Sequence, residues 1–332
     1  MKESLQKVNI GILGMASIAR SSFIPAIYNL PEKFLLTSIA SEVFTSKNKY
    51  DGFNNNVLYS SYEELIENKK IDAIYIALPN SMHFKWAKKA LEKNIHVICE
   101  KPLTCSFDQT KALIEIAIKN NLGLMETFQF RFHNQFKKIL SIIKNNQIGN
   151  LRSLKASFSF PPFPNKDNIR YKSALGGGSL FDAGCYTIKI AQLILGEHLQ
   201  VESANLFKPK GAEVDLWGSA CLEDSKNQVS SLLTFGFDNF YQCNIELLGQ
   251  TGKLSTERIF TAPKNYEPSL KLETSTNNRI LKLDADDHFV KMLNYFYKLI
   301  NNDNNLRQLE YSQISNQAYL IDKVREKSNK SF

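Results

Sequence analysis

The sequence predicts two domains of different class: a doubly wound parallel sheet, then an open, mainly antiparallel sheet with helices on one face. In residues 1–125, short apolar runs alternate with amphipathic helical segments, which is typical of βαβ units. In residues 126–332, strand-like segments follow one another directly, as in hairpins, and two helical segments come last. The prediction allows these last helices to pack back on the first domain. A length of 332 residues suits two domains.

The elements of the first domain have local signals. Apolar runs that end in Gly, Pro or charged residues predict strands, and Ser61 is a plausible N-cap for the helix that follows it. Ser81, after the break at Pro79, is expected to cap another helix. The strands are expected at 8–14, 34–40, 71–78, 95–99 and 123–127, and the helices at 17–29, 61–69, 81–91 and 106–120.

The second domain begins with a helix and continues with strands in which apolar and polar residues alternate, so one face of each strand is expected to be buried. The other face of such a sheet must be covered, and oligomerisation is the usual solution. A homodimer or homotetramer that pairs through this sheet is therefore expected. The helices are expected at 133–144, 287–300 and 312–327, and the strands at 151–160, 199–207, 212–222, 229–237, 240–248, 253–260 and 270–283.

Composition excludes several classes of protein. Hydrophobic residues make up 43% of the chain and charged residues 22%, as in an ordinary globular protein. No apolar run approaches the roughly 20 residues that span a membrane, and the N-terminus lacks the pattern of a signal peptide. The five cysteines form no C-x-x-C pair, so we expect a cytoplasmic protein without disulfides. The net charge of +8 is spread along the chain, which argues against a nucleic-acid partner and leaves room for a phosphate-bearing small molecule.

A G-x-A-x-x-A motif, Gly14 to Ala19, follows the first strand. Gly14 permits a tight turn, Ala16 is small enough for the backbone to approach a pyrophosphate, and Ala19 allows close helix packing. The start of the next helix, at Ser17 and Ile18, would present backbone N–H groups to the phosphates. Its place at the first strand–helix junction predicts dinucleotide binding.

The second strand ends at Ser41 and Glu42, where a cofactor's adenosine ribose is expected. A carboxylate there can accept hydrogen bonds from the ribose hydroxyls and would repel a 2′-phosphate, which favours NAD over NADP. Glu42 could also be a loop residue that points to water, and Lys47 and Lys49 could still reach a phosphate.

A buried strand ends in Glu100-Lys101-Pro102, and ligands of open α/β sheets bind beyond such carboxyl ends. Because Pro102 disfavours the helical region for Lys101, the direction of the lysine is restricted. An ammonium at this position can polarise a substrate oxygen.

A glycine run, Gly176 to Gly178, precedes a segment in which Asp182 and Tyr186 are spaced four apart on one helical face. Hydride transfer to a carbonyl leaves an alkoxide that needs a proton, which a tyrosine hydroxyl can supply with help from a nearby cation. Lys101 is that cation if the two domains face each other, so we expect Lys101 and Tyr186 to meet beside a nicotinamide. Asp182 would orient a substrate hydroxyl.

The chain resembles the Gfo/Idh/MocA family of dinucleotide-dependent oxidoreductases. The motifs that carry the resemblance follow one another in the family's order over nearly the whole chain: Gly14 to Ala19 with Pro25-Ala26, Tyr62 to Leu65, Asp72 to His83, Glu100-Lys101-Pro102, Glu126, Arg131 to His133, and Gly176 to Tyr186. The resemblance implies a Rossmann domain, a substrate-binding sheet domain that pairs subunits, and a lysine beside the nicotinamide. It implies cofactor contacts from Leu78, Pro79, Asn80 and Glu100. His83 is expected in the cofactor site or as a cap, and no metal site is expected.

Tyr186 stands where inositol dehydrogenase-like members have a histidine. This resembles dihydrodiol dehydrogenases, xylose dehydrogenases and nucleotide-sugar 3-ketoreductases, and residues 257–263 with 287–289 resemble the ketoreductases most. The expected function is an NAD(P)-dependent oxidoreductase that acts on a sugar or a nucleotide-linked sugar. A dehydrogenase of a free sugar or of a dihydrodiol is the alternative. A dinucleotide-sensing regulator without activity is the alternative from another class, although it would not need Lys101, Asp182 and Tyr186.

Overall fold

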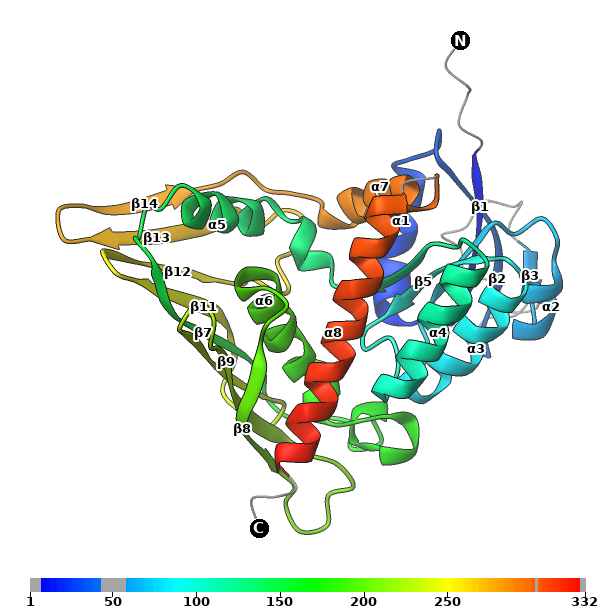
Figure 1. Ribbon diagram of the computed structural model, residues 1–332. Coiled ribbons are helices and arrows are strands. Elements are labelled where there is room, and N and C mark those ends of the chain that lie inside the picture. The colour runs from blue at the N-terminus through cyan, green and yellow to red at the C-terminus, as the bar shows by residue number, and fades with distance from the viewer. Residues whose placement is uncertain (1–6, 43–57, 302–303, 329–332) are drawn as a thin grey trace. The chain divides into compact units, whose positions relative to one another are not determined.

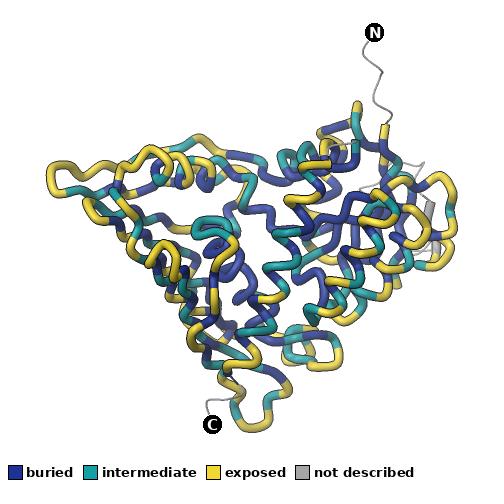
Figure 2. Tube along the Cα trace, viewed as in Figure 1, coloured by how far each residue is buried: buried dark blue, intermediate teal, exposed yellow. Residues whose placement is uncertain are grey.

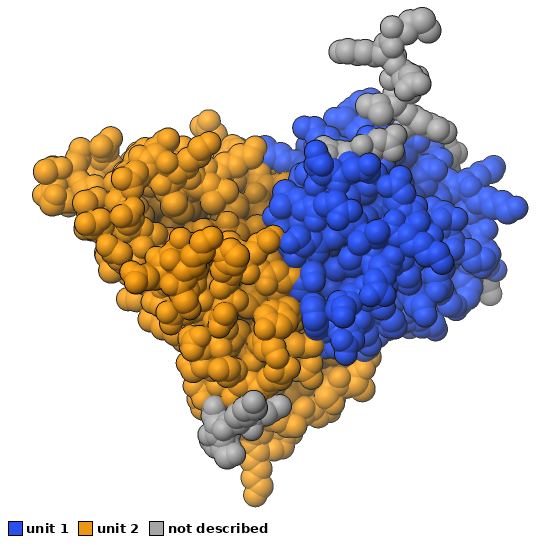
Figure 3. Space-filling view, viewed as in Figure 1, with its two compact units in different colours: residues 1–127, 289–315 blue, residues 128–288, 316–332 orange. Residues whose placement is uncertain are grey.

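The computed structural model describes residues 7–42, 58–301 and 304–328 (Figure 1). The chain divides into two compact units, which Figure 3 distinguishes by colour. Unit 1 comprises Met1–Thr127 and Phe289–Ser315, and unit 2 comprises Phe128–His288 and Asn316–Phe332. Lys47 and Lys49, which were considered as phosphate-binding residues, lie outside the described residues.

Unit 1 is built on a parallel sheet in the order β3-β2-β1-β4-β5-β6. This is the strand order of dinucleotide-binding domains, in which ligands bind at the carboxyl ends of the strands where the order reverses. The sequence predicted every strand except β3, whose three residues give little signal. The strands are β1 (Val8–Leu13), β2 (Phe34–Ala40), β3 (Leu58–Ser60), β4 (Ala73–Ile76), β5 (His96–Glu100) and β6 (Leu124–Thr127).

Side-chain caps start two of the helices of unit 1, at Ser61 and at Ser106. The Ser61 hydroxyl accepts from the Glu64 N–H and the Glu64 carboxylate accepts from the Ser61 N–H, so the expected cap is confirmed as a capping box. The expected cap at Ser81 is wrong, because that helix already begins at Asn80, with Pro79 as the N-cap residue. The helices are η1 (Ala19–Phe23), α1 (Ile24–Tyr28), α2 (Tyr62–Glu67), α3 (Asn80–Glu92) and α4 (Phe107–Lys119).

The C-terminal part of the chain completes unit 1. Helix α7 (His288–Ile300) and the first half of α8 (Asn304–Ser328) belong to it. Tyr311 and Ile314 of α8 are buried in the same apolar cluster as Trp86 and Leu122. The Tyr311 hydroxyl donates to the Leu122 carbonyl. The core of unit 1 is therefore formed by segments almost two hundred residues apart in the sequence.

Unit 2 contains a sheet in the order β14-β13-β12-β11-β7-β10-β9-β8, antiparallel except for the pair β7 and β10. Buried and exposed residues alternate along its strands (Figure 2), which confirms the one-sided burial that the sequence predicts. The strand predicted at 270–283 is a hairpin, β13 and β14. The strands are β7 (Leu151–Ser159), β8 (Gln200–Phe207), β9 (Trp217–Asp224), β10 (Val229–Gly236), β11 (Gln242–Gly249), β12 (Gly252–Glu257), β13 (Ser269–Thr274) and β14 (Asn278–Lys282).

Helices cover one face of this sheet. Helix α6 packs against β7 and β10 near the middle of the sheet (Figure 1), and its residues from Cys185 to Gln192 are all buried. The helical elements of unit 2 before the end of the chain are η2 (Gln129–Phe132), α5 (Asn134–Lys144), η3 (Ile169–Tyr171), η4 (Ser173–Leu175), η5 (Leu180–Gly184) and α6 (Cys185–Leu195).

Candidate functional site

The turn after β1 has the geometry that the fingerprint predicts. Gly14 has φ +88°, which L side chains rarely adopt, and a Cβ there would lie 2.3 Å from the Ala77 carbonyl oxygen. The Gly14 N–H donates to the Ala40 carbonyl (2.8 Å), so the ends of β1, β2 and β4 converge at this glycine. Only glycine fits there. This supports the predicted phosphate-binding turn.

Ala16 and Ser17 are exposed beside this turn, and Ile18 is half-buried. The first N–H groups of a helix have no intrahelical acceptor, so the start of this helical segment can offer donors to a ligand. Exposed donors at the carboxyl edge of the sheet suit a pyrophosphate, so the residues present fit a dinucleotide.

Glu42 follows β2 and is exposed. Its charge lies near the Tyr62 phenol: burial raises the pKa of Tyr62, and the Glu42 carboxylate raises it further. A hydrogen bond with the Glu42 backbone opposes this rise in the pKa. Ser41 is half-buried. A carboxylate thus stands at the expected ribose position.

The Glu100-Lys101-Pro102 segment is held in place by buried side chains. The Tyr75 hydroxyl, fully buried in β4, donates to the Glu100 carboxylate at 2.6 Å. Burial raises the pKa of Glu100, while the hydrogen bond from Tyr75 and the charge of Lys101 oppose the rise. On the far side of Lys101, the Leu103 N–H donates to the Glu126 carboxylate at 2.8 Å. Lys101 therefore projects from a backbone that is fixed on both sides.

His83 is fully buried and joins two loops of this edge. Its Nδ1 lies 2.8 Å from the Pro102 carbonyl oxygen and its Nε2 lies 2.8 Å from the Leu78 carbonyl oxygen. Burial lowers the pKa of His83, although both carbonyl oxygens favour the protonated ring. The ring thus fixes the turn at Leu78, Pro79 and Asn80, all half-buried, relative to the residue after Lys101. A contact between His83 and the cofactor stays a prediction.

Tyr186 lies in unit 2, on α6, with 6% of its surface exposed. The Gln129 side-chain amide donates to the Tyr186 hydroxyl at 3.5 Å. Four phenylalanine rings surround the tyrosine ring, with centroids 5.2–6.1 Å away: Phe128, Phe130, Phe158 and Phe260. The rings restrict the position of the hydroxyl and keep much of the side chain out of water.

Asp182 lies on η5, four residues before Tyr186, and is held by Arg170. The Arg170 Nε donates to the Asp182 carboxylate at 2.7 Å, and the Asp182 side chain is 13% exposed. The sequence singled out Asp182 but did not predict this ion pair. Structure and sequence agree that Asp182 and Tyr186 belong to one continuous helical segment.

The start of this helical segment is built by Asp215 and by the glycine run. The Asp215 carboxylate accepts from the Ser179 hydroxyl (2.6 Å) and from the Leu180 N–H (2.8 Å). A Cβ on Gly177 would lie 2.4 Å from the Arg170 carbonyl oxygen. The glycine run is therefore needed so that the loop that carries Arg170 can pack against the helix start.

Sequence reasoning missed three residues that support the predicted ones. Tyr75 binds Glu100, Gln129 binds Tyr186, and Asp215 caps the helical segment that carries Asp182. Tyr75 could have been found, since β4 and β5 are adjacent parallel strands and its side chain is a polar group in an apolar run. The structure places Lys101 in unit 1 and Asp182 and Tyr186 in unit 2. The expected meeting of Lys101 with Tyr186 stays a prediction.

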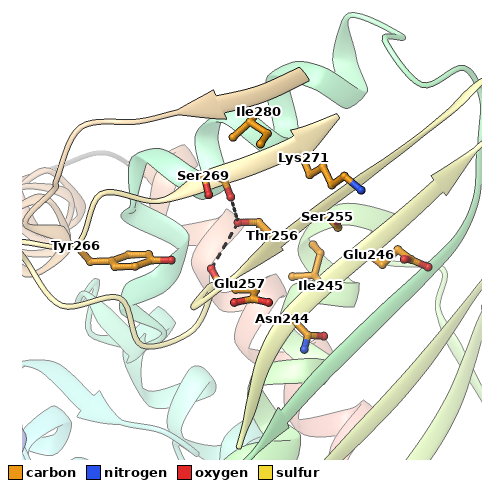
Figure 4. A pocket seen from close by; sticks show the side chains of 10 residues that line it. All are labelled: Asn244, Ile245, Glu246, Ser255, Thr256, Glu257, Tyr266, Ser269, Lys271 and Ile280. Atoms are coloured by element: carbon orange, nitrogen blue, oxygen red, sulfur yellow. Dashed lines mark hydrogen bonds between the residues drawn. The ribbon is translucent and has the colours of Figure 1, made fainter. Parts of the chain in front are cut away.

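A separate hollow of about 420 Å³ lies on the sheet of unit 2 (Figure 4). Strand register places Glu246, Ser255, Lys271 and Ile280 in one row across β11 to β14. Tyr266 lies at one end of the hollow in Figure 4. None of the predicted catalytic or cofactor-binding residues lines it.

Among the described residues, no group of three or more His, Cys, Asp and Glu side chains could hold a metal ion. No helix formed by these residues is both long and apolar enough to cross a membrane.

Comparison with known proteins identifies relatives over almost the whole chain. A dTDP-3,4-didehydro-2,6-dideoxy-α-D-glucose 3-reductase from Actinomadura kijaniata is 34% identical over 319 residues, 96% of this chain and 95% of its own. A D-xylose 1-dehydrogenase (NADP⁺) from Haloferax volcanii is 36% identical over 56% of this chain and 57% of its own. The crystal structure of a 3-ketoreductase from Actinomadura kijaniata with NADP and TDP-benzene matches with TM-score 0.88 at 32% identity, over 97% of this chain and 98% of that chain.

Two family models match as well. Residues 8–128 match the model of an oxidoreductase family with an NAD-binding Rossmann fold, and residues 136–255 match the C-terminal domain of the same family. Together with the relatives, these matches show that the chain belongs to the Gfo/Idh/MocA family of oxidoreductases.

Proposed function

We propose that the protein is an NADP(H)-dependent reductase of a ketone at C3 of a dTDP-linked deoxysugar. The observation that carries the proposal is the similarity to dTDP-sugar 3-reductases over 96% of the chain, combined with a buried Tyr186 in the position expected for the proton donor. A family resemblance alone would suit many sugars. The end-to-end match with these reductases supports the nucleotide-linked class.

The chain's residues suit the transfer of a proton to a carbonyl oxygen. A bound reduced nicotinamide would supply the hydride to the carbonyl carbon. Tyr186 gives its hydroxyl proton to the carbonyl oxygen, and the Gln129 amide stabilises the phenolate that remains by donating to it. The aromatic rings around Tyr186 keep the hydroxyl oriented for this step.

Lys101 has the role that the family resemblance gives it: its ammonium polarises the substrate oxygen and favours the phenolate. The bonds from Tyr75 to Glu100 and from Leu103 to Glu126 keep the backbone around Lys101 in one conformation. Gly14, Ala16, Ser17 and Ile18 hold the pyrophosphate of the cofactor.

Two observations bear on the choice of cofactor. The carboxylate of Glu42 favours NAD, as the sequence predicts, whereas the related 3-ketoreductase was crystallised with NADP. The end-to-end match with that protein supports NADP, with Glu42 as a residue that weakens the preference. Comparison of kcat/KM for NADH and NADPH tests this choice.

The experiment that tests the function is reduction of a dTDP-linked 3-ketosugar with NADPH, followed by product analysis. Tyr186→Phe should lower turnover about 10²- to 10⁴-fold, the usual contribution of a general acid, and should leave the Kd of NADPH unchanged. If Tyr186→Phe turned over as fast as the wild type, Tyr186 would be excluded as the proton donor. Faster turnover of free D-xylose than of the nucleotide-linked sugar would instead favour the activity named for the Haloferax relative.

A second proposal concerns assembly: two copies pair through the face of the unit 2 sheet that carries the hollow. Leu232 (48% exposed) and Leu248 (46% exposed) contribute apolar surface to this sheet. Ion pairs cross neighbouring strands from Lys155 to Glu246 (3.6 Å) and from Lys253 to Glu273 (3.3 Å). Exposed apolar side chains that share one sheet face, here with Ile280 (68% exposed) in the same row as Leu232, suit contact with another protein surface.

A further inference from the structure

The loop before the glycine run carries an arginine that the proton-transfer chemistry does not use. Arg170 lies in η3, and its side chain is 39% exposed. Its Nε is bound to Asp182 at 2.7 Å. Within the described part of the chain, no protein group hydrogen-bonds the two terminal nitrogens of this guanidinium. Four N–H donors of Arg170 therefore face solvent in a fixed plane.

Several contacts fix that plane before any ligand binds. The guanidinium carbon lies 4.8 Å from the centroid of the Phe163 ring, so the arginine stacks on an aromatic face. The Arg170 N–H donates to the Asn168 side chain at 3.1 Å, and its carbonyl accepts from the Gly178 N–H at 3.0 Å. An arginine held in this way loses little conformational entropy when it binds an anion.

The position of Arg170 suits one part of the proposed substrate. Asp182 and Tyr186 are four residues apart, so they are separated by about one helical turn, ~5 Å, along the segment, and Arg170 is bound to Asp182. In a nucleotide-linked 3-ketosugar, the diphosphate is attached to C1, two ring carbons from the ketone that Tyr186 protonates. Planar arginine donors bind phosphate oxygens in a bidentate manner, which is the geometry that the outer edge of this guanidinium offers.

We infer that Arg170 binds the diphosphate of the substrate and so determines the preference for nucleotide-linked over free sugars. This inference rests on the proposed function and extends it to a specific residue. Asp182 then has a second task, since its carboxylate orients the guanidinium that receives the diphosphate.

The neighbouring Lys172 provides a matched control. It lies two residues away in the same loop, and its side chain is 37% exposed. Its ammonium already faces two carboxylates, Asp167 at 3.6 Å and Glu213 at 3.8 Å. Replacing Lys172 removes one positive charge from the same loop, as replacing Arg170 does. It does not remove the guanidinium donors that are proposed to bind the anion.

The test measures the Kd of dTDP by calorimetry, with the full-length protein saturated with NADP. Arg170→Met should weaken dTDP at least tenfold, as expected for the loss of charge-assisted hydrogen bonds. Arg170→Lys should recover part of that loss, and Lys172→Met should change the Kd less than twofold. An unchanged Kd of NADP in every variant would show that the variants are folded.

The outcomes separate this inference from the proposed function. If wild-type protein binds dTDP and Arg170→Met binds it equally well while kcat falls, Arg170 only positions Asp182 and the inference is wrong. If wild-type protein does not bind dTDP at all, the nucleotide-sugar substrate is refuted and the inference falls with it. A loss of dTDP affinity in Lys172→Met as large as in Arg170→Met would also refute a specific role for Arg170.

Discussion

Substitution of Gly14 by alanine tests whether the turn after β1 has the strict geometry described above. Two costs are expected. An alanine at φ +88° pays about 1–2 kcal/mol for the left-handed backbone. Its Cβ would also lie 2.3 Å from the Ala77 carbonyl oxygen and 2.9 Å from the Ala77 carbonyl carbon, which are backbone atoms at the end of β4 and cannot rotate away. Relief of such a clash by backbone movement costs roughly 1–3 kcal/mol more.

Gly211 separates the two costs. It has φ +86°, almost the same as Gly14, but a Cβ there would meet nothing within 4 Å. Gly211→Ala should therefore lose only the 1–2 kcal/mol of backbone strain, about half of the loss in Gly14→Ala. Urea denaturation measures both losses in the free energy of unfolding.

Cofactor binding gives the second readout of this pair. Movement of the Gly14 turn displaces the N–H groups next to it, so the Kd of NADPH should rise at least about tenfold in Gly14→Ala, a loss of 1.4 kcal/mol. Gly211→Ala should bind NADPH as the wild type does. Equal stability losses in the two variants, together with an unchanged Kd in Gly14→Ala, would refute the reasoning.

Three further predictions follow from other parts of the structure. His96 accepts a hydrogen bond from the Gly123 N–H at 2.8 Å, and burial, aided by the charge of Arg307, lowers the pKa of His96 to about 4. Because the unfolded state binds the proton more readily, the stability from this group is complete above pH 6.5 and is lost as the pH falls toward 4. The free energy of unfolding should therefore be about 2 kcal/mol lower at pH 5 than at pH 7, and His96→Gln should lack this loss. Glu42→Ala should raise the ratio of kcat/KM for NADPH to that for NADH about three- to tenfold, and an unchanged ratio would show that this carboxylate does not face the 2′-phosphate. Leu232→Glu should weaken self-association in analytical ultracentrifugation, whereas Leu309→Glu, at a similarly exposed position (49%) on α8, should not, and equal sedimentation of both variants would contradict pairing through the unit 2 sheet.

Sequence patterns predicted the sheet of unit 1 well because its central strands are buried on both faces. Such strands read as continuous apolar runs, as at Ala73–Ile76, where every residue is buried. The short edge strand β3 lacks such a run and was missed. The hairpin β13–β14 was merged into one strand, although the Ser275 to Asn278 stretch is a turn signal that could have separated the two strands.

The site residues that were predicted lie in recognisable sequence motifs. The residues that were missed come close to the site only in the folded chain. Gly14 has the conformation that its motif requires. In contrast, the partner of Asp182 comes from a loop twelve residues earlier, and the Asp215 cap comes from a segment 35 residues later. His83 was noticed, but its contacts with two carbonyl oxygens depend on how two loops approach one another. Spacing along a helix or strand cannot reveal such partners.

The participation of α8 in unit 1 has a consequence for how the chain acquires its structure during synthesis. A ribosome that has translated residues 1–127 has produced the whole parallel sheet, but not Tyr311 and Ile314, which are buried in its apolar cluster. Part of the apolar surface of the nascent sheet therefore stays exposed while most of unit 2 is synthesised. Pauses in translation between these segments would prolong that exposure, and the same dependence means that the cofactor domain cannot be excised as one contiguous fragment without losing part of its core.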